Sequence, residues 1–379
     1  MKTLIGVFGI LLILIILQDG FEAIILPRRV TRRFRFTRFF YRMIWIPWRA
    51  LARRMRSGKR REDYLSWFGP LSLILLLSVW ASGLLMGFAM LQWALVSPLH
   101  APDGPVRFGT YVYMSGTTFF TLGYGDVTPA APLGRVLAVV ETGMGFGFFA
   151  LVIGYLPVIY QAFSRRETNI SLLDARAGSP PSAAELLRRH GNRVEAIDDL
   201  LRDWEHWSAD LMESHISYPV LCYYRSQHNN QSWLAALTAI LDTSALVIVG
   251  VDGAAERQAE LTFAMARHAV VDLAQTFNMP PRAPVPDRLP PDELTRLRST
   301  LADSGVRLRQ DAAADAKLPK LRRMYEPYVN ALAEFLFMPL PRWTPASAVV
   351  DNWQTSAWGR ISARTAASTS IGTDDEEHL

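Results

Sequence analysis

Two long apolar segments constrain the fold of this chain more than any other feature. Leu71–Val96 has 26 residues and no charged side chain, which exceeds the roughly 20 residues that a helix needs to cross a bilayer. Leu133–Tyr160 is similarly apolar, and Glu141 is its only acidic residue. Because hydrophobic residues make up 50% of the whole chain, we expect an all-α membrane protein that also has a sizeable polar part.

The N-terminal apolar run, Thr3–Leu17, is shorter than these two segments. It reaches a spanning length only by including several polar residues and ending at Leu26. Two interpretations stay open: a secretory signal peptide, since Lys2 precedes the run, and a retained transmembrane helix over residues 1–26. No A-x-A-like cleavage site follows the run, so we favour the retained helix.

A basic, aromatic-rich segment over residues 27–69 sets the expected orientation. Residues 28–61 contain 14 Lys and Arg and no acidic residue, and such clusters face the cytoplasm. The chain would then cross the cell membrane several times, with its C-terminal domain in the cytoplasm. Basic charge beside apolar segments indicates anionic membrane lipids as partners, and not nucleic acid.

Arginines recur at every third position of the basic segment, at Arg29, Arg32, Arg35 and Arg38. A voltage sensor uses this spacing but also needs neighbouring helices with counter-charges, and only one candidate helix precedes the segment. We therefore expect lipid-facing arginines on one or two interfacial helices, with Pro47 as a break between them. The alternative is a topology signal with no further role.

A glycine-rich motif, Thr121-Leu122-Gly123-Tyr124-Gly125-Asp126, lies between the two long apolar segments. In a narrow path lined by backbone, carbonyl oxygens and a threonine hydroxyl can replace the water shell of a potassium ion. The uncharged, aromatic-rich run Phe108–Phe120 precedes the motif and predicts a short pore helix. This order resembles the pore signature of the potassium channel superfamily, in particular the two-transmembrane, one-pore-loop domain of prokaryotic channels.

The resemblance implies a pore domain over residues 70–161 in each of four identical chains. Its expected parts are an outer helix (71–96), a pore helix with selectivity filter (108–126) and an inner helix (133–160). K⁺ would bind at Thr121, Leu122, Gly123 and Tyr124, with Gly125 closing the outer mouth and Asp126 and Thr118 supporting the filter. K⁺ is the permeant ion, and no cofactor and no catalysis are implied.

The support behind the expected filter departs from the family pattern. Several prokaryotic members carry a carboxylate in the pore helix where this chain has Thr117. An intramembrane carboxylate is a functional candidate, so our hypothesis is that Glu141 supports the filter from the inner helix, together with Thr117 in the pore helix. The alternative is a packing residue that affects only assembly.

Three glycines follow Glu141 in the inner helix, and a proline lies further along. Glycine costs roughly 0.5–1 kcal/mol relative to alanine inside a helix, so three within five residues need a reason. We expect either a gating hinge or close helix packing through small residues, and a kink at the proline near the cytoplasmic mouth. These residues are Gly143, Gly145, Gly147 and Pro157, of which Gly145 matches the usual hinge position most closely.

The rest of the chain reads as mostly helical. We expect a cytoplasmic helical domain (167–279), a Pro-rich linker (280–291), further helices (292–360) and a disordered acidic tail (361–379). Within it, Trp233–Val251 is apolar enough to be another membrane helix or a buried helix with Asp242 at a polar junction. We favour the buried helix, because a central aspartate is costly in lipid.

No motif in this C-terminal part identifies a ligand. There is no strand followed by G-x-G-x-x-G and no calcium-binding loop. The spacing of His206, His215, Cys222 and His228 fits no common metal site.

The expected function is therefore passive, K⁺-selective conduction through a homotetramer, gated by an unknown signal. The alternatives are a non-selective cation pore and a membrane-anchored sensor whose main role lies in its cytoplasmic domain. An enzyme is not favoured, since the sequence has no evident nucleophile–base pair or phosphate loop.

Overall fold

The computed structural model describes residues 2–26, 36–102, 105–190, 195–227, 230–252, 254 and 256–345. Within these residues the chain is helical apart from loops and two strands of two residues each. It divides into two compact units: unit 1 is Met1–Phe163 with Ser217–Arg225, and unit 2 is Ser164–Ile216 with Ser226–Leu379. Several sequence-based predictions concern residues outside the described part, namely those for Arg29, Arg32, Arg35, His228 and the tail over 361–379.

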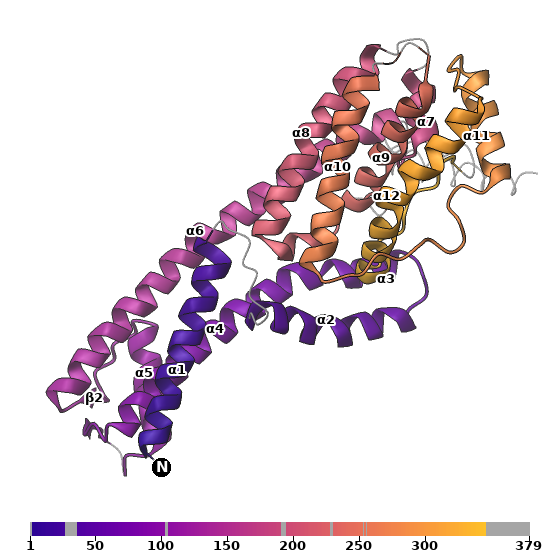
Figure 1. The fold of residues 1–379 in the computed structure, drawn as a ribbon. Helices are drawn as coiled ribbons and strands as arrows, with labels where there is room; N and C mark the ends of the chain where they lie inside the picture. The colour runs from indigo at the N-terminus through magenta and orange to yellow at the C-terminus, as the bar shows by residue number, and fades with distance from the viewer. Residues whose placement is uncertain are drawn as a thin grey trace, which may run out of the picture. The chain divides into compact units, whose positions relative to one another are not determined.

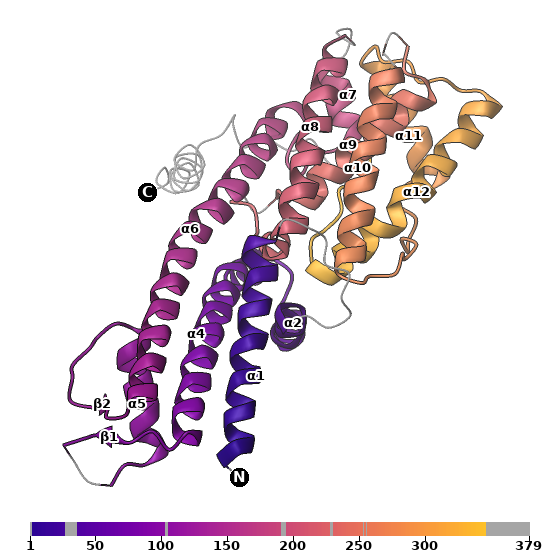
Figure 2. The same cartoon turned by 60° about the vertical axis from the view of Figure 1, so that its left-hand side comes forward.

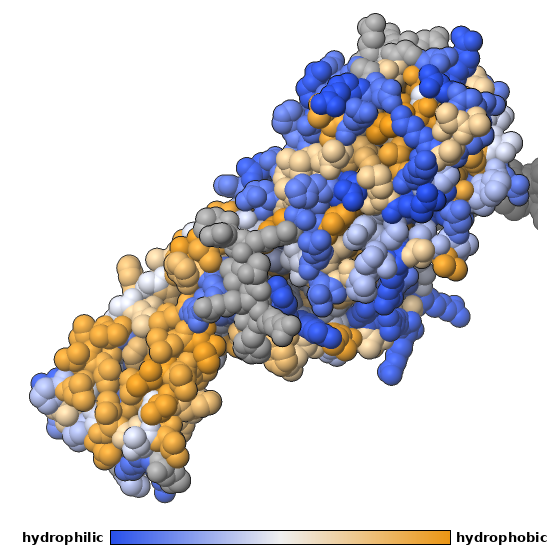
Figure 3. Space-filling view, in the orientation of Figure 1, coloured by the Kyte–Doolittle hydropathy of each residue, from blue (hydrophilic) through white to orange (hydrophobic). Residues whose placement is uncertain are grey.

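Unit 1 contains the apolar helices that the sequence predicts (Figure 1). Its elements are α1 (Lys2–Gly20), the π-helical turn η1 (Phe21–Ile25), α2 (Phe36–Arg54), α3 (Lys59–Ser66), α4 (Phe68–Ala94), β1 (Leu99–His100), α5 (Phe108–Phe119), β2 (Thr128–Pro129), the first part of α6 (Pro132–Ala177) and the 3-10 turn η2 (Pro219–Tyr223). The expected outer, pore and inner helices are α4, α5 and α6. Apolar side chains gather on the surface over α1 and α6 (Figure 3).

Glycines bring α1 and α4 close together, and the two helices lie side by side (Figures 1 and 2). A Cβ atom on Gly9 would lie 2.7 Å from the carbonyl oxygen of Gly87. Small residues allow such backbone approach between membrane helices. Asp19, at the end of α1, is buried and accepts hydrogen bonds from Thr37 N in α2 and Trp80 Nε1 in α4, both at 3.1 Å. A single carboxylate thus ties α1 to two other helices.

The prediction that Pro47 breaks the basic segment is wrong, because α2 continues through it from Phe36 to Arg54. Aromatic contacts on both sides of the proline hold the helix in place. The ring centroids of Trp45 and Phe68 are 4.6 Å apart, and Trp48 stacks on Tyr64 at 4.5 Å. These packing contacts therefore offset the loss of the backbone hydrogen bond that proline cannot donate.

Unit 2 is built around a fully buried helix. Its elements are the last part of α6, α7 (Ala183–His190), α8 (Glu195–Ser217, up to Ile216), α9 (Trp233–Gly250), α10 (Glu256–Thr276), α11 (Pro291–Asp303) and α12 (Ala312–Leu336). The central helix is α9, which packs against α7, α10 and α12. By length and composition, α9 is among four described helices able to cross a membrane, but 94% of it is buried. Its apolar composition is accounted for by this position.

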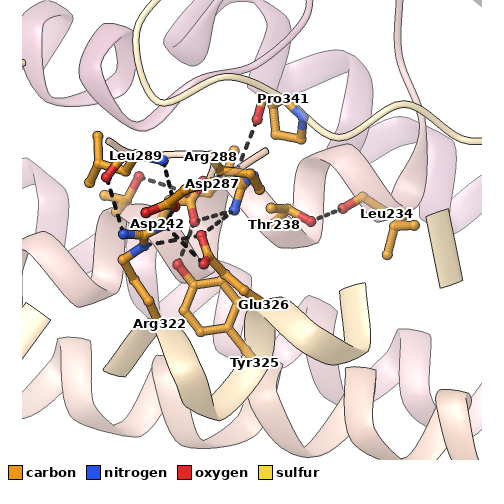
Figure 4. Close-up of polar contacts among 12 residues, drawn as sticks. Leu234, Thr238, Asp242, Asp287, Arg288, Leu289, Arg322, Tyr325, Glu326 and Pro341 are labelled. Atoms are coloured by element: carbon orange, nitrogen blue, oxygen red, sulfur yellow. Dashed lines mark hydrogen bonds and ion pairs between the residues drawn. The ribbon is translucent and has the colours of Figure 1, made fainter. Parts of the chain in front are cut away.

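Asp242 of α9 lies at a buried polar junction (Figure 4). Arg288 Nη2 donates to its carboxylate at 2.6 Å, and Arg288 Nη1 donates to Glu326 Oε1 at 3.0 Å. The Tyr325 hydroxyl also donates to Asp242, at 2.5 Å. Arg288 belongs to the Pro-rich stretch expected to be a linker, so this stretch contributes a charge to the interior of unit 2.

Candidate functional site

The glycine-rich motif follows α5 closely. Carbonyl groups at the end of that helix accept hydrogen bonds from the first amide groups of the motif. Thr117 O accepts hydrogen bonds from Leu122 N at 2.8 Å and Gly123 N at 3.3 Å. Thr118 O accepts from Thr121 N at 3.1 Å. The last carbonyls of a helix need such partners, so α5 fixes where the motif starts. Thr117 and Thr118 act here through their backbone.

Positive φ angles alternate along the motif. They occur at Thr121 (56°), Gly123 (58°) and Gly125 (75°), and not at Leu122 or Tyr124. A β-branched residue at positive φ is an outlier and costs of the order of 1–3 kcal/mol. No atom lies within 4 Å of a Cβ built on Gly123 or Gly125. The backbone conformation, and not a lack of space within one chain, therefore requires glycine at these two positions.

The C-terminal end of the motif is held by α5, and the loops on its two sides pair with each other. Tyr113 in α5 donates a hydrogen bond from its hydroxyl to Asp126 Oδ2 at 2.8 Å. β1 and β2 pair antiparallel, with Leu99 opposite Pro129. Asp126 was predicted from the sequence, whereas its partner Tyr113 was not. The available signal was an aromatic hydroxyl in the helix that precedes the motif.

Behind the motif, a buried polar cluster joins α4, α5 and α6. Glu141 in α6 and Gln92 in α4 are both 0% exposed. Ser115 Oγ in α5 contacts the Glu141 carboxylate in a short hydrogen bond and also lies 2.8 Å from Leu85 O in α4. Gln92 lies beside the same carboxylate. Neither its side-chain nitrogen nor its side-chain oxygen has a hydrogen-bond partner among the described residues.

The partner of Glu141 is thus Ser115, and not Thr117. The Thr117 hydroxyl donates to Met114 O in its own helix at 3.0 Å. Sequence reasoning identified Glu141 but missed Ser115 and Gln92. Their polarity inside otherwise apolar helices was the signal available, since Gln92 is the one amide side chain in Leu71–Val96.

Of the three inner-helix glycines, Gly145 is required by close packing against another helix of the same chain. A Cβ on Gly145 would lie 2.1 Å from the Phe119 carbonyl oxygen, at the last residue of α5. No atom lies within 4 Å of a Cβ on Gly143 or Gly147. α6 continues through all three and through Pro157. Their role as a gating hinge stays a prediction.

Large apolar side chains are exposed both on the motif and on α6 in a single chain. Leu122 is 55% exposed and Tyr124 is 70% exposed. On α6, Val139 and Ile153 are 72% and 71% exposed. This exposed apolar surface requires lipid or another protein surface against it.

In unit 2, the histidine at position 215 belongs to a hydrogen-bonded cluster. His215 is fully buried, and Arg166 Nη1 donates to its Nε2 at 3.0 Å. A guanidinium can only donate, so Nε2 accepts and the ring proton is on Nδ1. Glu167 pairs with Arg166 at 2.8 Å. Burial, and then the charge of Arg166, lowers the pKa of His215 well below its ordinary value. Within the described residues, no cluster of three or more His, Cys, Asp or Glu side chains is arranged to hold a metal ion.

Comparison with known proteins agrees with this arrangement of the pore segments. Residues 74–161 match the ion channel family. The matched residues run from α4 through the glycine-rich motif to α6, so they include Glu141 and all three glycines. Four described helices are long and apolar enough to cross a membrane. These findings support an ion channel with a multi-pass membrane location.

A membrane protein from Bacillus subtilis (strain 168), named "Uncharacterized membrane protein YdjJ", is 26% identical over 182 residues. The aligned part covers 47% of this chain and 52% of the relative. The chain therefore spans about half the length of this curated relative. No solved structure matches.

Proposed function

We propose that this protein is a potassium-selective channel and that K⁺ passes along Thr121–Gly125. The observation that carries the proposal is the alternation of positive φ at Thr121, Gly123 and Gly125 between α5 and α6. A filter of backbone carbonyls needs a run of non-helical, strained backbone held by its surroundings. The match of residues 74–161 to the ion channel family supports the same conclusion.

Four copies of the chain surround the pore in this proposal. Each chain has one glycine-rich motif, and one motif cannot encircle an ion. Neighbouring copies would cover the exposed side chains of Leu122 and Tyr124 and part of the exposed face of α6. K⁺ then moves passively through carbonyl sites that bind it and let it leave by multi-ion repulsion.

The support of the filter comes from two sides in this scheme. Asp126 is held through Tyr113 on the outer side. Glu141, through Ser115, braces α5 against α6 on the inner side. A carboxylate inside the membrane is costly unless it is paired, which is why we assign it a role beyond packing.

Anionic lipids are the proposed partners of α2, on the cytoplasmic side. Arg38 and Arg42 are exposed on this helix. Phe39, Met43 and Ile46 are exposed as well, at 51%, 57% and 58%. An amphipathic helix of this kind lies in the interface, with its apolar side in the acyl boundary and its basic side at lipid phosphates.

Potassium flux from proteoliposomes tests the filter. Gly123→Ala should abolish K⁺ flux, because alanine disfavours the positive φ at this position. Gly109→Ala is the matched control: Gly109 lies in α5, its φ is not positive, and no atom lies within 4 Å of an added Cβ. The control should conduct like the wild type, and both variants should elute as tetramers. Equal Na⁺ and K⁺ permeability in the wild type would favour the non-selective pore.

The brace is tested separately with Glu141→Gln. The amide keeps the size of the side chain and replaces one carboxyl oxygen by an NH2 group, which cannot accept a hydrogen bond, so we expect an altered open probability with unchanged assembly. Ser115→Ala, which removes the partner, should change open probability in the same direction. Loss of the tetramer in Glu141→Gln, with normal conduction in the remainder, would instead favour a packing role.

A membrane-anchored sensor is the second candidate function. Unit 2 makes up more than half of the chain, and its buried charged clusters are unrelated to the filter. A wild-type protein that forms tetramers but passes no cation would favour this alternative.

A further inference from the structure

A short segment between α8 and α9 belongs to unit 1, although its flanking helices belong to unit 2. The chain leaves unit 2 after Ile216, contributes Ser217–Arg225 to unit 1, and returns to unit 2 at Ser226. We call Ser217–Arg225 the latch segment. The chain therefore passes between the two units three times: once within the continuous helix α6 and once at each end of this segment.

The latch segment is anchored on the aromatic side of α2 and α4. Tyr223 is 4% exposed. The centroid of its ring lies 5.0 Å from that of Trp45 and 4.9 Å from that of Phe68, and it stacks on Tyr41 at 5.8 Å. Tyr223 therefore anchors the segment in unit 1 through three other aromatic rings.

The same segment also contacts α6. The rings of Tyr218 and Tyr155 are 5.6 Å apart, and so are those of Tyr224 and Phe163. Tyr224 further presses on the backbone of α4, where a Cβ on Gly69 would lie 2.6 Å from its Cδ2. The latch segment thus touches the outer helix and the cytoplasmic half of the inner helix at once.

A charge pair ends the segment. Arg225 has an 8% exposed side chain and lies 3.5 Å from Glu62 Oε2 in α3. Burial lowers the pKa of Arg225 to about 10, and Glu62 acts in the opposite direction. A buried guanidinium needs such a partner, so release of the segment from unit 1 also breaks this pair.

We propose that the latch segment is the gating coupler of the channel: it holds the cytoplasmic half of α6 to α4 and transmits movements of unit 2 to α6. This inference rests on the proposed channel function. Within unit 1, α6 runs without interruption from the Gly145 contact to Phe163. It cannot shift relative to α4 unless the contacts of Tyr218 and Tyr224 change. Coupling of this kind needs a physical element with two arrangements, and in this proposal the segment is bound to unit 1 in one arrangement and released from it in the other.

Cys222 offers a readout of the latch that does not depend on conduction. It is the single cysteine of the chain, it lies within the segment, and it is 0% exposed. Its rate of reaction with a maleimide therefore measures how often the segment leaves unit 1. The full chain in lipid nanodiscs is labelled, and the open probability is measured in parallel in planar bilayers.

The test variants are Tyr155→Ala, Tyr218→Ala and the double variant. Phe335→Ala is the matched control, because it removes an aromatic pair with Phe277, at 5.4 Å, inside unit 2. Each latch variant should speed labelling of Cys222 by about tenfold, at the upper end of what one aromatic pair contributes. Each should also change the open probability, and the double variant should add little, since both single variants remove the same contact. The control should match the wild type in both measurements.

Faster labelling with unchanged open probability would overturn the proposal, because the segment would then be only structural. Additive effects of the two substitutions on open probability would overturn the role of this contact. If the wild type passes no cation, the proposed function fails, and the labelling alone decides on the latch. In that case an unchanged labelling rate in Tyr155→Ala would overturn it.

Discussion

Replacing Gly145 by alanine should displace α6 from the end of α5. The new Cβ would lie 2.1 Å from the Phe119 carbonyl oxygen and 2.9 Å from its carbonyl carbon. Ordinary contact between a carbon and a carbonyl oxygen begins at about 3.3 Å, so the two helices must separate by about 1.2 Å. Such overpacking typically costs about 1–3 kcal/mol, against a gain of about 0.5–1 kcal/mol from alanine inside a helix.

The displacement reaches the glycine-rich motif because Phe119 precedes Thr121 by only two residues. We expect Gly145→Ala to lower K⁺ flux at least about tenfold, given that shifts of about 1 Å disable comparable preorganised sites. Its thermal midpoint should also fall. The assay is flux from proteoliposomes, normalised to the amount of reconstituted protein, together with thermal unfolding in detergent.

Gly143→Ala and Gly147→Ala are matched controls two residues away on either side. No atom of the chain lies within 4 Å of a Cβ at either position, so alanine should leave α6 in place and stabilise the helix slightly. Wild-type flux in Gly145→Ala would refute the packing argument. Equal loss of flux in all three variants would instead indicate that glycine flexibility, and hence a hinge, is what matters.

Two further predictions concern unit 2. Arg288→Ala should lower the free energy of unfolding of unit 2 by about 3–5 kcal/mol, because it leaves buried carboxylates without a partner. Arg282→Ala removes an exposed ion pair and should lower it by only about 0.2–1 kcal/mol. Urea unfolding measures both losses, and losses of similar size would contradict the prediction. The pKa of His215 is lowered by burial and by Arg166, so the unfolded chain takes up a proton near pH 6.5 that the folded chain does not. Stability from this group is full above about pH 6.5 and falls by about 1.4 kcal/mol per pH unit below it. His215→Gln should flatten that dependence, and an identical pH dependence in both proteins would contradict the assignment.

Helix positions were predictable where a local pattern decides them. The expected outer helix over 71–96 corresponds to α4 (Phe68–Ala94), and one of the helices expected over 292–360 is α11 (Pro291–Asp303). An uncharged run and a proline at a helix start are local signals. Pro47 was mispredicted because its local preference against a helix interior is overcome by tertiary contacts of Trp45 and Trp48.

Partners across the fold were not predictable in the same way. Asp242 was expected at a polar junction, but its partner Arg288 is 46 residues away in a proline-rich stretch. Glu141 was a candidate, yet its partner Ser115 depends on how α5 and α6 are rotated about their axes. Side-chain periodicity indicates which face of a helix is buried, and it does not indicate which distant residue that face meets. The same limit explains why Ser217–Arg225 could not be assigned to unit 1.

The contacts found only in the structure share one physical role. A strained backbone such as that at Thr121 persists only where its surroundings over-determine it. Here Tyr113 holds the outer end of the motif through Asp126, and Ser115 ties α5 to α6 through Glu141. Gly145 lets α6 approach the carbonyl at the base of the motif. Three contacts from different positions therefore constrain one short segment, and a substitution at any of them should relax the motif before it unfolds the helices. Conduction should accordingly be lost at smaller perturbations than stability.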